Sequence, residues 1–265
     1  MKTLIVSKTA LTVATVAFGA ALSLPAAVID FSTDPNLAGD WTEHNYYAPG
    51  NQDNVLASWN ATDQDLDFVS TADTGGGTSI IGLYSTSDHT RSATESVTMT
   101  VNALDRTDGN WGFLGLMISA DPLEHNYLAG TTDSYTLRMN AATDGTFQFA
   151  VWRTYADGAA GAALFTDNTS QTFSGSYVLD IERNGAGEYE FFANNVSLYT
   201  TTAATTGDDF YDATAKDSLL NYQMIMGGDG AMTATVDDFG IIPEPGTYAL
   251  LGGLFALSFV MVRRR

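Results

Sequence analysis

The amino-acid sequence predicts an all-β protein, built as an antiparallel two-sheet β-sandwich between two apolar terminal segments. Short runs in which polar and apolar residues alternate recur along the chain, and turn-forming residues separate them. Helical periodicity is almost absent, and residues 28–242 are enough for one sizeable domain. About a dozen strands in a domain of this size imply two packed sheets.

Three segments in the middle of the chain carry the clearest strand patterns. Residues 96–101 alternate between polar and apolar side chains, which predicts a half-buried strand. Residues 111–119 are almost wholly apolar, so we expect a central strand that is covered on both faces. In residues 135–139, Thr136 and Arg138 alternate with apolar side chains, which predicts a further strand.

Turn residues join further strands into hairpins. Asp144-Gly145 lies between two alternating runs, and this pair is a strong hairpin signal. Comparable turns are expected at residues 184–187, 194–195 and 227–230, and residues 232–236 form the strand that closes the domain.

One part of this pattern resembles a known fold family. Residues 176–183, the glycines Gly185 and Gly187, and residues 189–198 are similar to hairpins of the concanavalin A-like, laminin-G-like jelly rolls. The resemblance implies that the sandwich is a jelly roll.

The first 27 residues have the composition of a signal peptide. Lys2 and Lys8 form a positive region ahead of the apolar residues 10–24. Ala26 and Ala27 supply small residues at which a signal peptidase could cut. We therefore predict an N-terminal signal helix and export across the inner membrane, with an uncleaved N-terminal anchor as the alternative.

The last segment, residues 243–265, combines three features. It begins with Pro243-Glu244-Pro245-Gly246, continues with uncharged, mostly apolar residues 247–262, and ends with Arg263, Arg264 and Arg265. As a helix, residues 247–262 would be ~24 Å long, which is marginal for a bilayer core of ~30 Å. We predict a transmembrane helix over residues 247–262 with the arginines on the cytoplasmic side, and a helix buried in a soluble core is the alternative.

This tail resembles the PEP-CTERM sorting signal of exported proteins in Gram-negative bacteria. The resemblance implies that an exosortase is the processing partner and cuts near the Pro-Glu-Pro motif. It also implies a precursor anchored in the inner membrane, and a mature protein at the cell surface or in the extracellular matrix, where polysaccharide is a candidate partner. The exported domain would then be residues 28–242, between the signal peptide and the tail.

Charge and cysteine content exclude several classes of protein. The chain has 31 acidic and 11 basic residues and a formal charge of −20. Lys2, Lys8, Glu244 and the terminal arginines lie in the terminal segments, so residues 28–242 carry −24. Such a surface repels nucleic acid and favours divalent cations. The absence of cysteine excludes disulfides, thiol catalysis and cysteine-based metal sites.

Enzyme motifs are missing, and we expect no catalytic residues. His44, His89 and His125 have no metal ligand or nucleophile at motif spacing. Glu188 and Glu190 share one strand face, but such positions lie ~7 Å apart, whereas the carboxylates of a retaining glycosidase lie ~5 Å apart.

Two groups of aspartates are candidate calcium ligands. They are Asp63, Asp65 and Asp67 in one segment, and Asp30, Asp237 and Asp238 at the two ends of the domain. On a strand the first three carboxylates would face one side, where a cation would relieve their repulsion. The second group would assemble because first and last strands often adjoin in jelly rolls. No motif requires a cofactor, and a solvated acidic edge is the alternative for both groups.

Exposed aromatic residues are candidates for sugar binding, because a ring face stacks on the apolar face of a pyranose. Trp41 and Tyr47 lie in a polar segment and are the predicted ligand-binding residues. Trp152 and Tyr155 also have polar neighbours, but core packing is the usual role of an aromatic residue in a sandwich.

The sequence therefore predicts an exported protein with a non-catalytic structural or binding role in a polysaccharide-rich matrix, such as a biofilm. A calcium-assisted carbohydrate-binding module, similar to a lectin, is the first alternative. A divergent glycan hydrolase or lyase that uses Glu188 or Glu190 is the second.

Overall fold

The structure is a computed structural model that describes residues 27–31, 34–35, 41–47, 55–71, 79–85, 95–119, 134–154, 162–184, 188–201 and 221–243. Residues Ala27–Ile242 form one compact unit. Among the described residues no helix is long and apolar enough to cross a membrane. The predicted signal peptide up to Ala26 lies outside these residues, as does the predicted tail from Glu244 onward, with Pro245, Gly246 and the terminal arginines.

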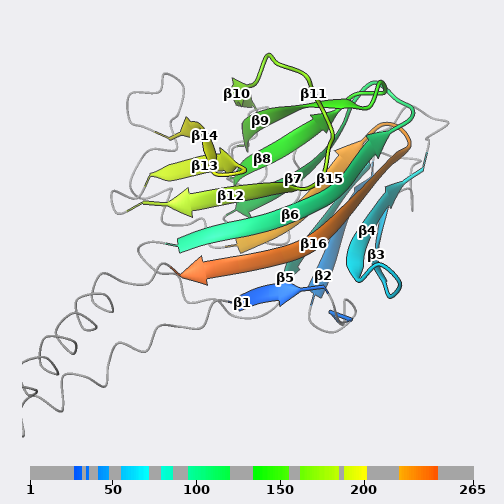
Figure 1. The fold of residues 1–265 in the computed structure, drawn as a ribbon, viewed down its shortest axis with the longest axis horizontal. Coiled ribbons are helices and arrows are strands. Elements are labelled where there is room, and N and C mark those ends of the chain that lie inside the picture. Colours follow the sequence, from blue (N-terminus) through cyan, green and yellow to red (C-terminus); the bar gives the residue numbers. More distant parts are fainter. Residues whose placement is uncertain are drawn as a thin grey trace, which may run out of the picture. The chain divides into compact units, whose positions relative to one another are not determined.

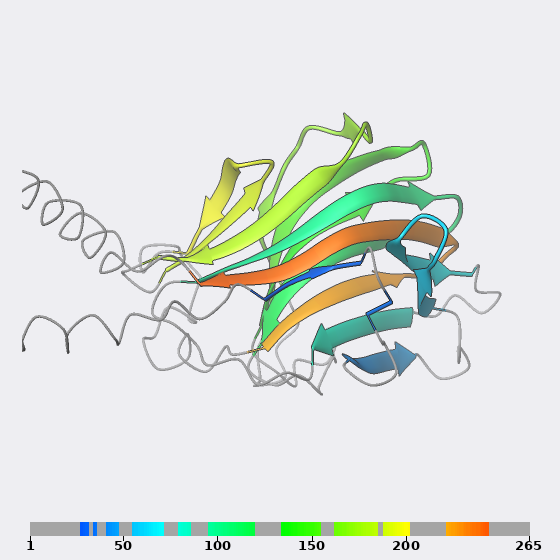
Figure 2. The ribbon, with the colours of Figure 1, turned by 60° about the horizontal axis from the view of Figure 1, so that its bottom comes forward.

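The described residues form sixteen strands in two antiparallel sheets, which pack face to face (Figures 1 and 2). Sheet A has the order β14-β13-β12-β6-β16-β4-β3, with β1 beside β16. Its strands are β1 (Ala27–Asp30), β3 (Val55–Asn60), β4 (Asp65–Ser70), β6 (Glu95–Arg106), β12 (Tyr177–Arg183), β13 (Tyr189–Ala193), β14 (Val196–Thr200) and β16 (Met232–Pro243).

Sheet B has the order β10-β9-β8-β7-β15-β5-β2, with β11 beside β9. Its strands are β2 (Trp41–Tyr47), β5 (Ser79–Ser85), β7 (Gly112–Ser119), β8 (Ser134–Ala141), β9 (Thr146–Thr154), β10 (Ala162–Thr166), β11 (Gln171–Thr172) and β15 (Asn221–Gly228). The predicted all-β, two-sheet antiparallel sandwich is confirmed.

Many neighbouring strands are distant in sequence, as in a jelly roll. In sheet A, β6 pairs with β12, so that Val97 lies opposite Ile181. In sheet B, β7 pairs with β15, so that Leu116 lies opposite Met224. The first and last strands also pair, as expected. These long-range pairings bring distant segments together at the ends of the sandwich.

The core between the sheets is apolar and rich in aromatic residues. Alternate residues of the long strands supply it, including Val97, Met99 and Val101 from β6 and Leu114, Leu116 and Ile118 from β7. The largest fully buried side chains are Tyr135, Tyr189, Phe31, Phe68, Phe113, Phe147, Phe191, Phe239 and Leu66. With no cysteine in the chain, burial of these side chains is the main source of stability.

The predicted central strand is confirmed, and so are the turns at residues 144–145 and 194–195; the expected turn at residues 227–230 is shorter, because β15 continues to Gly228, and residues 185–187 lie outside the described residues. Every residue of β7 is buried. Gly145 has a φ of 75° in the β8–β9 hairpin, and Asn194 and Asn195 have φ values of 48° and 62° between β13 and β14. Two adjacent positive φ values are typical of the type I′ turn, which matches the twist of the flanking strands.

Two strands differ in extent or burial from what their sequences indicate. The outer face of β8 is buried although polar residues alternate along it, with Thr136 exposed by 2% and Arg138 by 3%. The closing strand also continues beyond Val236 to Pro243, the first residue of the predicted sorting motif. Within it, Val236 and Phe239 both face the core although they are three residues apart, so the alternation breaks at Asp237 and Asp238.

Candidate functional site

A second apolar cluster lies on the outer face of sheet B. It consists of Phe113 and Met117 from β7 and Ile225 from β15, with Trp111 packed against it. Phe113 and Met117 alternate along β7 with residues of the main core, so they project from the opposite face of the sheet. These side chains point away from the main core but are exposed by 3% or less, so this part of the outer face is covered.

Aromatic rings and one arginine form a continuous stack on this face, which we call the ladder: Trp111, Phe113, Arg138 and Trp152. The Trp111 and Phe113 rings are stacked with centroids 6.1 Å apart. The Arg138 guanidinium carbon lies 4.8 Å from the Phe113 ring centroid and 3.7 Å from that of Trp152. Rings on both sides attract the cation through their π electrons, which helps Arg138 to remain charged while buried.

Gly115 makes room for the ladder at its middle. It lies opposite Arg138 in the pairing of β7 with β8. A Cβ atom at this position would lie 2.7 Å from the Leu137 carbonyl oxygen and 3.1 Å from the Arg138 Cβ. The absence of a side chain therefore lets β8 and its arginine approach β7 closely.

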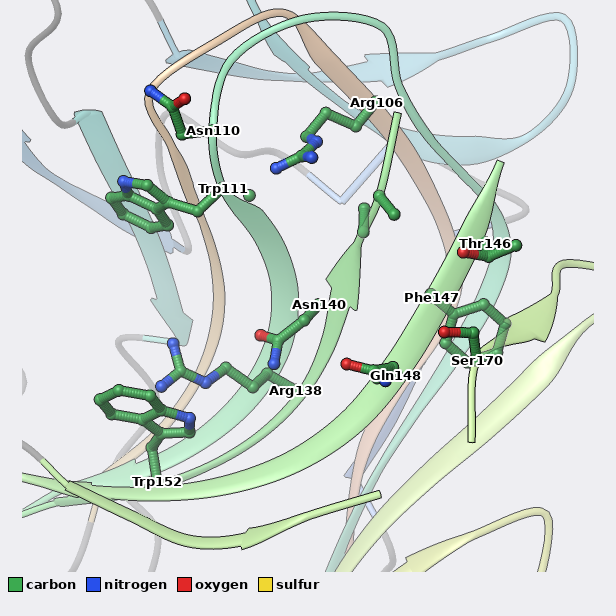
Figure 3. A pocket seen from close by; sticks show the side chains of 13 residues that line it. Arg106, Asn110, Trp111, Arg138, Asn140, Thr146, Phe147, Gln148, Trp152 and Ser170 are labelled. Carbon is green, nitrogen blue, oxygen red and sulfur yellow. The ribbon is translucent and has the colours of Figure 1, made fainter. Parts of the chain in front are cut away.

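A pocket of about 420 Å³ opens beside the ladder, at the end of sheet B (Figure 3). Arg138, Asn140, Gln148 and Trp152 line it from β8 and β9, Arg106 from the end of β6, and Trp111 from the β6–β7 connection (Figure 3). Ser170 and Thr146 add hydroxyl groups. None of the described residues that line the pocket is acidic. Indole rings, amides, hydroxyls and two cations are groups that bind a polar ligand with apolar faces.

Asp229 holds Trp111 in place at the pocket. One carboxylate oxygen accepts hydrogen bonds from the backbone N–H groups of Asn110 (2.7 Å) and Trp111 (3.0 Å), and the other accepts one from the Asn110 side chain (3.0 Å). Burial alone would raise the pKa of Asp229, but these hydrogen bonds lower it below its ordinary value. The β15–β16 turn thus fixes a loop that is more than one hundred residues away in sequence.

Two glycines let the β6–β7 connection and the β15–β16 turn approach each other. Gly109 has a φ of 83°, and a Cβ atom there would lie 2.5 Å from the Asp229 carboxylate. A Cβ atom at Gly230 would collide with the backbone of Asp108 and Gly109. The position of Trp111 therefore depends on backbone contacts that larger residues would prevent.

Arg106, the last residue of β6, enters the pocket from sheet A. Its side chain is exposed by 8%, and in the described part of the chain nothing accepts a hydrogen bond from its Nε. A buried guanidinium whose donor lacks a protein acceptor is costly, because water no longer solvates it.

The first predicted calcium group is brought together in part. Asp65 and Asp67 lie on β4, on the side opposite the core residues Leu66 and Phe68, as predicted. Asp63 lies in the preceding turn and not on a strand, so this part of the prediction was wrong. The Asn60 side-chain amide donates hydrogen bonds to Asp63 (3.0 Å) and to Asp67 (3.1 Å).

The structure also brings the second calcium group close to the first. Asp30 lies opposite Asp238 in the pairing of β1 with β16. The charge of Asp237 is one of those that raise the pKa of Asp65, after burial and the charges of Asp67 and Asp63. Within the described residues, however, no three acidic or histidine side chains converge in a way that could hold a metal ion. The calcium sites therefore remain predictions.

The other predicted residues lie away from the pocket or cannot be placed in full. Trp41 and Tyr47 are the first and last residues of β2, at the edge of sheet B, opposite Ser85 and Ser79 of β5. Of the alternative catalytic pair, Glu190 lies on β13 of sheet A, and Glu188 directly precedes that strand, so the two do not share a strand face as predicted. The Asn184 side-chain amide donates hydrogen bonds to Glu188 (2.9 Å) and Glu190 (3.1 Å) and so lies between the two carboxylates.

The pocket was not predicted as a site, although the sequence contained part of its signal. Trp152 has polar neighbours in the sequence, but core packing is the usual role of such a residue. No motif in the sequence marks Trp111, Arg106 or Arg138 as binding residues. A strand-by-strand comparison of charge would have helped, because β7, β8, β9 and β15 contain no acidic residue.

Comparisons with known proteins place the fold but not the family. No family model and no curated protein sequence matches the chain. The carbohydrate recognition domain of Emp46p in its potassium-bound form is similar in structure, with a TM-score of 0.53, 7% identity, and coverage of 84% of this chain and 96% of that domain. The same domain of Emp47p gives a TM-score of 0.52 at 10% identity, with the same coverage.

A glycoside hydrolase family 16 endo-glucanase from Bacteroides ovatus is also similar, with a TM-score of 0.51, 11% identity, and coverage of 81% of this chain and 99% of the enzyme. At these identities the likeness shows the fold alone. The chain has the concanavalin A-like jelly-roll fold, which carbohydrate recognition domains and glycoside hydrolases share, and the fold resemblance seen in the sequence is confirmed.

Proposed function

We propose that this chain is an exported carbohydrate-binding protein that does no chemistry, and that the pocket on sheet B is its binding site. The observation that carries the proposal is the pocket itself, in which the indole rings of Trp111 and Trp152 stand among amide, hydroxyl and guanidinium groups. Ring faces can stack on the apolar faces of a sugar while these polar groups bind its hydroxyls. The fold shared with carbohydrate recognition domains supports the same function.

The same pocket gives no support to hydrolysis. Glycoside hydrolysis by the common mechanisms requires two carboxylates beside the scissile bond. The described lining residues supply none, and Glu188 and Glu190 lie just before and on β13 of the other sheet, with the Asn184 amide between them. Binding without catalysis is therefore the function that the described geometry favours.

Export and anchoring complete the proposal and rest on the sequence. Residues 1–27 would direct the chain across the inner membrane, and the tail from Pro243 would be processed by an exosortase. The mature protein would then bind polysaccharide at the cell surface or in the extracellular matrix. Calcium bound by the aspartates of sheet A would act on stability, because the described pocket contains no carboxylate.

The test is saccharide binding by the full chain, purified in detergent and titrated calorimetrically with a panel of neutral and acidic oligosaccharides. Trp152→Ala should weaken binding about tenfold, because it removes a stacking surface worth about 1.4 kcal/mol. Trp59→Ala is the matched control, since Trp59 lies on β3 of sheet A, where its indole donates a hydrogen bond to the Phe31 carbonyl. Failure of every saccharide to bind, or equal losses in both variants, would refute the proposal.

A further inference from the structure

The two sheets carry very different charges. The strands of sheet A contain ten acidic residues and two arginines. The strands of sheet B contain one acidic residue, Glu43, and two arginines. In a chain with a formal charge of −20, the strands that form the floor of the pocket are thus almost free of negative charge.

The pocket gathers cations as well as excluding carboxylates. Four arginines are described, Arg106, Arg138, Arg153 and Arg183, and the first two line the pocket. Both are more than nine-tenths buried. They come from different sheets, Arg106 from β6 and Arg138 from β8, so the fold and not a local sequence motif brings them to one cavity.

Among the described residues, Arg106 has no close anionic partner that would account for its burial. The carboxylate whose charge interacts with it is that of Asp144, in the exposed β8–β9 turn. Asp144 accepts hydrogen bonds from the Thr146 hydroxyl (2.6 Å) and the Thr146 backbone N–H (3.0 Å). These hydrogen bonds lower the pKa of Asp144 more than the charge of Arg106 does. Arg106 is therefore free of any close ion pair in the described part of the chain.

We propose that the pocket binds an acidic saccharide, with Arg106 pairing with the anionic group of the sugar while the indole rings of Trp111 and Trp152 contact its ring. The proposal rests on the carbohydrate-binding function above and adds the chemical class of the ligand. A uronate carboxylate and a sugar sulfate share the chemistry that a guanidinium recognises, which is a pair of anionic oxygens that accepts two parallel N–H groups.

The burial of the site makes the local cations decisive. At physiological ionic strength the Debye length is ~8 Å, so acidic residues of sheet A that lie farther than this from the pocket act only weakly on a ligand there. Arg106 and Arg138, in contrast, line the cavity directly and are shielded from water. A charge-assisted hydrogen bond is stronger in such surroundings than at an exposed surface.

The first experiment changes the ligand and leaves the full chain intact. Galacturonate oligomers, the same oligomers as methyl esters, sulfated galactan oligomers and neutral glucan oligomers are titrated against the protein in 0.15 M salt. We expect the acidic oligomers to bind at least tenfold more tightly than the methyl esters, because esterification removes the charge and keeps the sugar. Preference for the uronate or for the sulfate identifies which anion the site takes.

The second experiment changes the arginine. Arg106→Gln should lower the affinity for the acidic oligomers about 10- to 100-fold and that for neutral oligomers much less, because glutamine can still donate a hydrogen bond to a sugar hydroxyl. Arg183→Gln is the matched control, since Arg183 is also buried but lies at the end of β12 in sheet A, and it should change neither affinity.

The outcomes separate this proposal from the function on which it rests. Equal affinities for the acidic oligomers and their esters would overturn the acidic-ligand proposal and leave carbohydrate binding intact. Loss of affinity for neutral and acidic oligomers alike in Arg106→Gln, with unchanged unfolding temperature, would overturn the role of Arg106 as an anion-binding residue. Failure of every oligomer to bind would overturn both proposals.

Discussion

Asp65 is the residue at which a single substitution should stabilise the protein. It begins β4, its side chain is exposed by 8%, and its Oδ1 has no hydrogen-bond partner among the described residues. Burial raises the pKa of Asp65, and the charges of Asp67, Asp63 and Asp237 raise it further. The folded protein therefore holds a carboxylate where ionisation is unfavourable.

The sign of the pH dependence follows from this raised pKa. Stability contributed by Asp65 is fully present below its unfolded pKa of ~3.9 and is lost as the pH rises through the higher pKa of the folded state. At pH 7 the ionised side chain thus destabilises the fold. Asp65→Asn removes the charge and keeps the shape, so the variant should be more stable than the wild type at pH 7.

The size of the gain can be bounded from the environment of the carboxylate. A buried acceptor without a partner costs about 1–3 kcal/mol. The asparagine retains an oxygen at this position, so we expect the lower end, about 1 kcal/mol. In a domain of this size this corresponds to a rise of about 2–4 °C in the unfolding temperature.

The assay is thermal unfolding of the full chain in chelator at pH 7 and at pH 3. Asp105→Asn is the matched control, because it removes one exposed carboxylate from β6 of the same sheet. Asp65→Asn should raise the unfolding temperature at pH 7 more than the control does, and by little at pH 3. A lower unfolding temperature at pH 7, or equal gains at both pH values, would refute the reasoning.

Adding calcium to the same samples tests the predicted cation site. If the aspartates bind calcium, the ion should raise the free energy of unfolding of the wild type by linkage, by about 2.7 kcal/mol at one hundred times its Kd. The unfolding temperature should rise accordingly. Asp65→Asn should then lose most of that increase. If the aspartates form a solvated acidic edge, calcium should shift neither protein.

Two further substitutions test how the pocket is held together. Asp229→Ala removes three hydrogen bonds and should cost about 2–4 kcal/mol in the free energy of unfolding and weaken saccharide binding. Since the pKa of Asp229 is lowered, this loss of stability should disappear as the pH falls through that pKa. Equal losses at pH 7 and pH 2 in thermal unfolding would contradict this role. Gly115→Ala should cost about 1–3 kcal/mol in denaturant unfolding, because its Cβ meets the Leu137 carbonyl; a neutral effect would show that β7 and β8 can separate freely.

The local features of the fold could be predicted from the sequence because they depend on neighbouring residues. Asn194 and Asn195 have the positive φ values of a type I′ turn, and asparagine is a residue type that favours this turn. The almost wholly apolar sequence of β7 likewise indicates a strand that is covered on both faces. Such signals need no knowledge of distant partners.

The pocket could not be predicted in this way, because its residues meet only in the folded chain. Arg138 alternates with apolar residues on β8, and alternation alone indicates an exposed side chain. It is buried because Phe113 and Trp152, from two other strands, cover it from both sides. Trp111 similarly takes its position from Asp229, whose proximity depends on the pairing of β7 with β15.

The separation of charge between the sheets links the acidic composition to the proposed function. A strongly acidic surface keeps an exported protein soluble, but it repels an acidic polysaccharide from almost every direction. The strands of sheet A contain ten acidic residues and those of sheet B contain one, so the strands that line the pocket from sheet B add almost no repulsion of their own. Arg106 and Arg138 would supply the local attraction for an acidic chain, and complementarity of this kind favours specificity more than affinity.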